Sequence, residues 1–212
     1  MTITAHAGAY ETQDNTLESI RTILSHKDEI DVIEVDVTFR DDGTPVIIHA
    51  GNAGVDGGES LDEALGLIAK ESDLMVNLDL KNFNPDFIPS VVELVNRHGL
   101  QKRAFWTGID AEFMDVVTKC SPTIPRYLNC KLILRHQKDI EAIAAIIEKY
   151  DCEGANMHFA STSHRLAELL HDRGRKLSLW TCNNEAEVKI AMSYNPDNIT
   201  SRFPAMVGKI VK

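Results

Sequence analysis

The stretch Ile33-Glu34-Val35-Asp36-Val37 is a run of branched apolar residues interrupted by two carboxylates. β-Branched side chains favour strands, and strand side chains alternate, so Glu34 and Asp36 point to the same side. The apolar remainder predicts a parallel strand that is buried on both faces. Two ionised carboxylates side by side in such a strand repel each other and lose hydration, which a cation, a shared proton or a wet cleft can relieve. A hard divalent cation with oxygen ligands, Mg²⁺ or Ca²⁺, fits this pair best.

Short apolar strands alternate with helical segments on both sides of this stretch. The pattern predicts strands at Thr2–His6, Val32–Phe39, Leu74–Lys81, Ala104–Gly108, Pro125–Lys131, Gly154–His158, Lys176–Cys182 and Asn198–Ser201. A helix is predicted after each strand, at Asn15–His26, Ser60–Glu71, Pro85–His98, Ala111–Lys119, Gln137–Tyr150, Ser161–Arg173, Glu185–Ser193 and Ala205–Val211. The first helix has a start signal at Asn15-Thr16-Leu17-Glu18, which is typical of a capping box.

Eight strand–helix units in 212 residues, without a long linker, predict a compact TIM (β/α)8 barrel. We expect one barrel domain over residues 1–212. An open, doubly wound sheet is the alternative, because alternation alone does not show that the sheet closes. Pro45–His49 is an additional extended piece, expected to continue the second strand through the turn at residues 41–43.

The composition limits the classes of partner. The formal net charge of −10 argues against binding to a nucleic-acid backbone, so we expect a small-molecule partner. The N-terminal residues lack the basic and apolar regions of a signal peptide, and no apolar run is long enough to span a bilayer, so no stable membrane anchor is expected. Four cysteines without a C-x-x-C pair predict free thiols and a cytoplasmic protein.

Polar residues gather where the first three predicted strands end. In a TIM barrel the active site lies at the carboxyl ends of the strands, so residues from adjacent strands converge there. The converging set has three carboxylates, two histidines and one lysine: Glu34, Asp36, Asp79, His6, His49 and Lys81. Three carboxylates can hold one divalent cation, which can bind a phosphate oxygen, while two histidines can divide proton transfer. The set therefore indicates phosphoryl transfer.

The same residues form an ordered series of motifs. The series runs His6-Ala7-Gly8, Asn15-Thr16, Glu34-Val35-Asp36, Asp42-Gly43, Pro45-Val46-Ile47-Ile48-His49-Ala50, Asp79-Leu80-Lys81, Trp180-Thr181-Cys182-Asn183 and Ser201-Arg202-Phe203-Pro204. In order and spacing this resembles the glycerophosphodiester phosphodiesterase family. The resemblance covers the whole chain, and its N-terminal half is specific.

The resemblance implies both a reaction and roles for individual residues. It implies hydrolysis of a glycerophosphodiester to glycerol 3-phosphate and an alcohol, with a cyclic phosphate formed first. His6 and His49 would be the catalytic pair. Glu34, Asp36 and Asp79 would bind one divalent cation, Mg²⁺ or Ca²⁺. Lys81 would contact the phosphate, and Trp180 would line the pocket wall.

The chain also departs from the family pattern. Ala7 stands where the family has an arginine that contacts phosphate, and Ala50 stands where it has an aspartate. Asp79 is shorter than the usual glutamate, and the family's insertion after the second strand is nearly absent. We expect Arg202, at the end of the strand that neighbours the first in a closed barrel, to replace the missing guanidinium; the alternative is a solvated rim arginine or one paired with an acidic neighbour.

Lys131, at the end of the fifth strand, is a further candidate phosphate contact. Two other functions remain open on the sequence. One is a phospholipid phosphodiesterase or cyclising lyase of the sphingomyelinase D type. The other is a non-catalytic barrel that binds a phosphate ligand, which Ala7 and Ala50 motivate. Retention of both histidines and all three carboxylates favours an enzyme, because a binding protein needs no acid–base pair.

Overall fold

The computed structural model describes residues 1–49, 57–130 and 137–211. Its strands are β1 (Thr2–Ala5), β2 (Val32–Phe39), β3 (Pro45–Ile47), β4 (Glu59–Ser60), β5 (Met75–Leu80), β6 (Ala104–Ile109), β7 (Arg126–Cys130), β8 (Gly154–His158), β9 (Lys176–Trp180) and β10 (Asn198–Ser201). Its α-helices are α1 (Leu17–Ser25), α2 (Leu61–Glu71), α3 (Ile88–Arg97), α4 (Met114–Cys120), α5 (Gln137–Lys149), α6 (His164–Asp172), α7 (Glu185–Met192) and α8 (Pro204–Val211).

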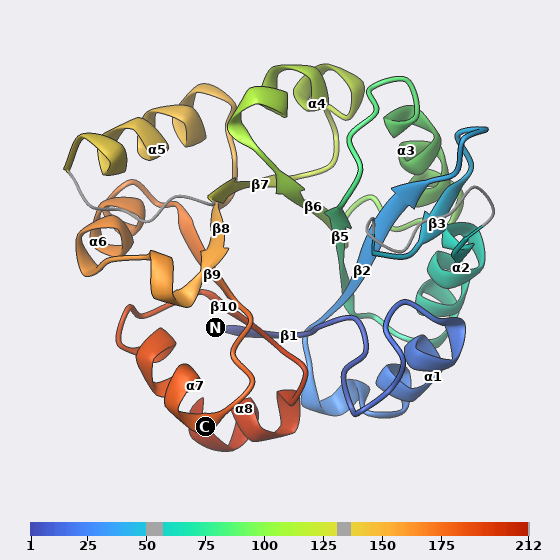
Figure 1. Cartoon of the computed structure of the whole chain (residues 1–212), viewed down its shortest axis with the longest axis horizontal. Helices are drawn as coiled ribbons and strands as arrows, with labels where there is room; N and C mark the ends of the chain where they lie inside the picture. The colour runs from blue at the N-terminus through green and yellow to red at the C-terminus, as the bar shows by residue number, and fades with distance from the viewer. Residues whose placement is uncertain (50–56, 131–136, 212) are drawn as a thin grey trace.

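The parallel strands form a closed barrel. β1 pairs in parallel with β2 on one side and with β10 on the other, which closes the ring. The remaining neighbours follow chain order from β2 and β5 round to β10. Figure 1 shows this ring of strands with the helices on its outside. The predicted TIM barrel is confirmed, and the open doubly wound sheet is excluded.

The short hairpin after β2 was also expected from the sequence. β3 runs antiparallel to β2, with Val37 opposite Ile47, and the turn closes through a hydrogen bond from the Arg40 amide to the Thr44 carbonyl at 3.0 Å. β4 then pairs antiparallel with β3. The hairpin carries His49 back toward the barrel mouth, because the Ile48 amide donates to the Asp36 carbonyl at 3.1 Å.

Two apolar layers hold the barrel together. Ile33, Val35 and Val37 belong to the large buried cluster that also contains apolar residues of the surrounding helices. A smaller buried cluster, formed by Val32, Phe105 and Tyr127 from three strands, lies apart from it. Alternate residues of β2 therefore face opposite sides: Ile33, Val35 and Val37 pack in the large cluster, and Glu34 and Asp36 face the barrel cavity.

The start of α1 differs from the prediction. The N-cap is Thr16, whose hydroxyl accepts a hydrogen bond from the Ser19 amide at 3.0 Å, so Glu18 does not complete a capping box with Asn15. Asn15 instead adopts a positive φ of 56° before the helix, a conformation that asparagine tolerates better than most residues. Its side chain reaches Asp36, a contact that local sequence pattern does not encode.

The other helices begin and end close to the predicted residues. The predicted helix at 111–119 begins with a 3₁₀ turn at Ala111–Phe113, and the helix predicted at 161–173 begins at His164, after a separate 3₁₀ turn at Phe159–Ser161. None of the helices in the described ranges combines the length and apolar character that a bilayer crossing requires.

Candidate active site

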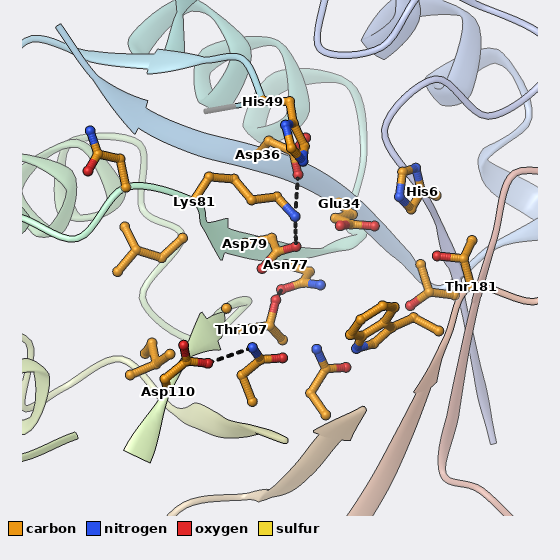
Figure 2. Close-up of a pocket in the computed structure, with 18 of the residues that line it drawn as sticks. His6, Glu34, Asp36, His49, Asn77, Asp79, Lys81, Thr107, Asp110 and Thr181 are labelled. Carbon is orange, nitrogen blue, oxygen red and sulfur yellow. Dashed lines mark hydrogen bonds and ion pairs between the residues drawn. The ribbon is translucent and has the colours of Figure 1, made fainter. Parts of the chain in front are cut away.

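A cavity of about 760 Å³ lies among the strand ends and the residues that follow them (Figure 2). Eight of the nine site residues predicted from the sequence line it: His6, Glu34, Asp36, His49, Asp79, Lys81, Trp180 and Arg202. The ninth, Lys131, lies outside the described residues, as do Ala50 and the segment 50–56 that contains most of the shortened insertion. The predicted convergence of the first three parallel strands is therefore observed.

The three carboxylates form one cluster. Glu34 and Asp36 lie two residues apart on β2, and Asp79 on β5 is directly opposite Asp36 in the parallel register. One oxygen from each of the three lies within 4.8 Å of those of the other two. Glu34 and Asp36 are only 5% and 2% exposed, so water screens their charges little.

Lys81 partly compensates this charge. Its Nζ lies 2.5 Å from Asp79 Oδ2 and 3.2 Å from Asp36 Oδ1 (Figure 2). Burial lowers the pKa of Lys81, but the charges of the neighbouring carboxylates outweigh burial and raise the pKa above its usual value. Burial, reinforced by the charges of Asp79 and Asp36, raises the pKa of Glu34 well above its usual range. Three carboxyl groups thus face a single ammonium group.

The cluster fits a divalent cation. Glu34 Oε2 and Asp36 Oδ1 are buried and accept no hydrogen bond from the described residues, and Asp36 Oδ1 is in contact with Lys81 through their ion pair. Gly108 leaves room beside Asp79, because a Cβ at this position, where φ is 75°, would lie 2.5 Å from Asp79 Oδ1. The ligand set consists of carboxylate oxygens alone, which Mg²⁺ and Ca²⁺ prefer.

The hydrogen bonding of His6 fixes which of its ring nitrogens carries the proton. Its Nδ1 lies 2.7 Å from the Ala7 carbonyl oxygen, and because a carbonyl only accepts, Nδ1 must carry the hydrogen. In the neutral ring Nε2 is then the unprotonated nitrogen. Burial lowers the pKa of His6 despite the opposing effects of that hydrogen bond and of Asp36, so the neutral form prevails at pH 7. His49 is exposed at the cavity and lies across Glu34 from His6 in the view of Figure 2.

Arg202 is paired with an acidic neighbour, which is the alternative considered for it from the sequence. Its guanidinium forms an ion pair with Asp14, an acidic neighbour that the sequence analysis did not identify. It also lines the cavity, and its positive charge contributes to the lowered pKa of His6. The pairing depends on Gly8, whose φ is 76° and at which a Cβ would lie 2.1 Å from Asp14 Oδ1.

Trp180 forms part of the wall. Its ring packs edge-on against His158 with 5.6 Å between centroids. His158 accepts a hydrogen bond from the Ala160 amide at 3.1 Å and so caps the following turn. Three residues after Trp180, the Asn183 side-chain oxygen accepts a hydrogen bond from the Arg202 amide at 3.0 Å. The Trp180–Asn183 motif thus supplies both a wall and a support for the arginine.

The remaining strands bring neutral polar groups that the sequence analysis missed. The Thr107 hydroxyl donates to the Asn77 side-chain oxygen at 2.8 Å, and Asn129 donates to Asp110 Oδ1 at 2.8 Å. The Ser178 hydroxyl donates to the Asn156 side-chain oxygen at 2.9 Å. These residues could have been identified from the sequence as polar residues inside otherwise apolar strands, which is the pattern that identified Glu34 and Asp36.

Comparison with solved structures supports the architecture. A protein from Silicibacter pomeroyi DSS-3, assigned to the glycerophosphoryl diester phosphodiesterases, has a TM-score of 0.84 at 18% identity, covering 99% of this chain and 92% of that one. A phosphodiesterase from Oleispira antarctica, solved with its product sn-glycerol-3-phosphate, has a TM-score of 0.82 at 19% identity, covering 100% and 96%. A glycerophosphodiester phosphodiesterase from Thermotoga maritima has a TM-score of 0.76 at 15% identity, covering 99% and 98%. Identities this low show a shared fold.

Comparison with curated proteins finds no match. The model of the glycerophosphoryl diester phosphodiesterase family matches residues 67–206. That range includes Asp79, Lys81, Trp180 and Arg202, and the N-terminal motifs precede it. The chain therefore belongs to the glycerophosphoryl diester phosphodiesterase family and is a phosphoric diester hydrolase.

Proposed function

We propose that the protein is a metal-dependent phosphodiesterase that hydrolyses a glycerophosphodiester to glycerol 3-phosphate and an alcohol. The buried carboxylate cluster carries this proposal, because three carboxyl groups with oxygens within 4.8 Å of one another, including buried oxygens that accept no hydrogen bond, suit a cation. Glu34, Asp36 and Asp79 would hold Mg²⁺ or Ca²⁺. When bound, the cation supplies Lewis-acid stabilisation of a phosphate oxygen.

The two histidines divide the proton transfers. His6 Nε2 accepts the proton of the glycerol hydroxyl next to the phosphate, and that oxygen forms a new bond to phosphorus. As the bond from phosphorus to the alcohol oxygen breaks, His49 donates a proton to the leaving alkoxide. In the second step water opens the cyclic phosphate with the proton roles reversed.

The other residues position the substrate. Lys81 provides positive charge toward the phosphate, and the Arg202 guanidinium provides a two-point contact in place of the family arginine missing at position 7. Trp180 forms an apolar wall beside the substrate. Lys131 remains a proposed additional contact. The described histidines and carboxylates belong to one barrel, so we propose that residues 1–212 act as a single catalytic domain.

We also propose a cytoplasmic location. All four cysteines are free, and Cys130, Cys152 and Cys182 are buried. Free thiols are typical of a reducing compartment.

The test is product analysis with glycerophosphocholine as the probe. Protein treated with a chelator is assayed alone, with Mg²⁺ and with Ca²⁺, and the products are identified by ³¹P NMR. We expect glycerol 3-phosphate only when a metal is added. A stable cyclic phosphate as final product would indicate a lyase, and binding without turnover would indicate a phosphate-binding barrel. Full activity after exhaustive chelation would refute the metal requirement.

A further inference from the structure

The side chain of Asn15 forms two hydrogen bonds with Asp36. The Asn15 amide nitrogen donates to Asp36 Oδ2 at 2.8 Å, and the Asn15 amide oxygen accepts from the Asp36 backbone N–H at 3.0 Å. Both residues are buried, with exposures of 7% and 2%. Two hydrogen bonds in opposite directions fix the side chain of Asp36 relative to its backbone. They also commit Oδ2 to Asn15 and leave Oδ1 to face the carboxylate cluster, where it lies 3.2 Å from Lys81 Nζ.

Asp79 is restricted in a similar way. Its Oδ2 lies 2.5 Å from Lys81 Nζ, and its Oδ1 occupies the space that Gly108 leaves open. Glu34 contributes the buried Oε2, which has no hydrogen-bond donor among the described residues. Glu34 Oε2 is therefore available to a cation, whereas Asp36 Oδ1 would bind it while lying 3.2 Å from Lys81 Nζ.

The number of available oxygens discriminates between the two candidate cations. Ca²⁺ takes about six to eight oxygen ligands and often binds both oxygens of a carboxylate. Mg²⁺ takes about six in near-octahedral geometry, uses single carboxylate oxygens and retains several waters. Two-oxygen binding by Asp36 would require the hydrogen bond from Asn15 to break.

We propose that Asn15 is a positioning residue that restricts Asp36 to single-oxygen ligation and thereby makes the site selective for Mg²⁺ over Ca²⁺. This inference rests on the proposed metal site. Asn15 is suited to the role because its φ of 56° turns the side chain back from the start of α1 toward β2. Thr16, rather than Asn15, caps the helix, so the amide of Asn15 is available to Asp36.

The test measures metal binding directly, by isothermal titration calorimetry of chelator-treated protein with Mg²⁺ and with Ca²⁺. The variant is Asn15→Gly, because glycine tolerates the positive φ and removes only the side chain. The matched control is Asn195→Gly, since Asn195 also has a positive φ, of 52°, and is exposed after α7, away from the cavity. Circular dichroism checks that both variants fold, and Asn15→Asp, which keeps the acceptor but loses the donor, replaces Asn15→Gly if that variant does not.

We expect the wild type to bind Mg²⁺ more tightly than Ca²⁺. Asn15→Gly should weaken Mg²⁺ binding by about 10–100-fold, the range typical when a partner of a metal ligand is removed, and should weaken Ca²⁺ binding much less. Asn195→Gly should change neither constant. A wild-type preference for Ca²⁺, or equal changes for both cations in Asn15→Gly, would overturn the inference while leaving the proposed metal site intact. Absence of binding of either cation to the wild type would instead remove the metal site itself.

Discussion

The two halves of the barrel wall present different kinds of polar group to the cavity. β1, β2, β5 and the hairpin after β2 contribute most of the ionisable groups, namely His6, Glu34, Asp36, His49, Asp79 and Lys81. The strands from β6 to β10 contribute mainly amides, hydroxyls and an indole, namely Thr107, Asn129, Asn156, Trp180 and Thr200. Most of the groups that can transfer protons or hold a cation at neutral pH therefore lie in the first half, because amides and hydroxyls do not titrate there. The carboxylate of Asp110, which follows β6, is an exception in the second half.

The halves also differ in which buried polar atoms of the cavity lack a hydrogen bond. In the second half Asn198 accepts a hydrogen bond from the Thr4 hydroxyl at 2.8 Å and donates to the Ser178 hydroxyl at 3.0 Å, while Trp180 Nε1 donates to no acceptor among the described residues. In the first half Glu34 Oε2 and Asp36 Oδ1 accept no hydrogen bond from the described residues. Buried polar groups are normally paired, so unpaired atoms that line a cavity suit a bound ligand. The unpaired carboxylate oxygens support the proposal that the first half holds the cation.

Substitution of the two histidines of the first half should have the largest effect on kcat. His6→Ala and His49→Ala are each expected to lower kcat by about 10²–10⁴-fold, with a smaller change in KM, because proton transfer stabilises the transition state. Steady-state kinetics on glycerophosphocholine provide the measurement. His98→Ala is the matched control, since His98 follows α3 and pairs with Asp62 rather than lining the cavity. A His6 or His49 variant with wild-type kcat would remove that residue from the mechanism.

Arg202 tests whether the second half contributes a charged contact. Arg202→Ala should lower kcat/KM by about tenfold to about a hundredfold, which corresponds to about 1.5–3 kcal/mol for a hydrogen bond to a charged group. Arg202→Lys should fall between this variant and the wild type, because it retains the charge but not the two-point geometry. Arg173→Ala is the control, as Arg173 is paired with Glu141 and Glu148 on the helical surface. Unchanged kinetics in Arg202→Ala would leave Arg202 as a rim residue paired with Asp14.

The pH dependence of kcat/KM tests the role of His6, which belongs to the first half. His6 must be neutral to accept a proton, and burial lowers its pKa below the usual value of 6.5. The acid limb of kcat/KM should therefore lie below pH 6.5, with a loss of about tenfold per pH unit beneath the pKa. A bound cation acts in the same direction, since positive charge disfavours the imidazolium. An acid limb at or above pH 6.5 would contradict this assignment.

The lowered pKa of His6 also has a consequence for stability. The unfolded chain binds a proton at His6 more readily than the folded protein does, so folding loses stability as the pH falls from 6.5 through the folded pKa. Thermal unfolding as a function of pH checks the sign, with His6→Ala as the reference that lacks this contribution.

Substitution of a neutral residue in the second half should have the smallest effect on the kinetics. Asn129 lines the cavity and donates to the Asp110 carboxylate, so Asn129→Ala removes that hydrogen bond and one neutral donor from the cavity. We expect KM to rise by about twofold to about tenfold, as a neutral hydrogen bond is worth about 0.5–1.5 kcal/mol, with kcat little changed. A fall in kcat as large as that of the histidine variants would show that the division between the halves is wrong.

Much of the fold and the core of the site follow from the sequence alone. Regular alternation predicted each parallel strand and its helix, because a strand buried on both faces is apolar throughout and a covering helix is apolar on one side. The spacing of two residues placed Glu34 beside Asp36, and Asp79 beside Lys81, since strand side chains alternate. Most of the other cavity residues named from the sequence end a strand or follow one, which places them at the barrel mouth.

Only the tertiary structure decided the contacts between loops. Asp14 and Arg202 are 188 residues apart and meet because β1 pairs with β10 at the closure of the barrel. Asn15 matched a helix start in the sequence, yet its side chain binds Asp36 on a neighbouring strand. Local patterns record which face of an element is buried, whereas a polar side chain in a loop takes its partner from whatever the closed barrel brings within hydrogen-bonding distance.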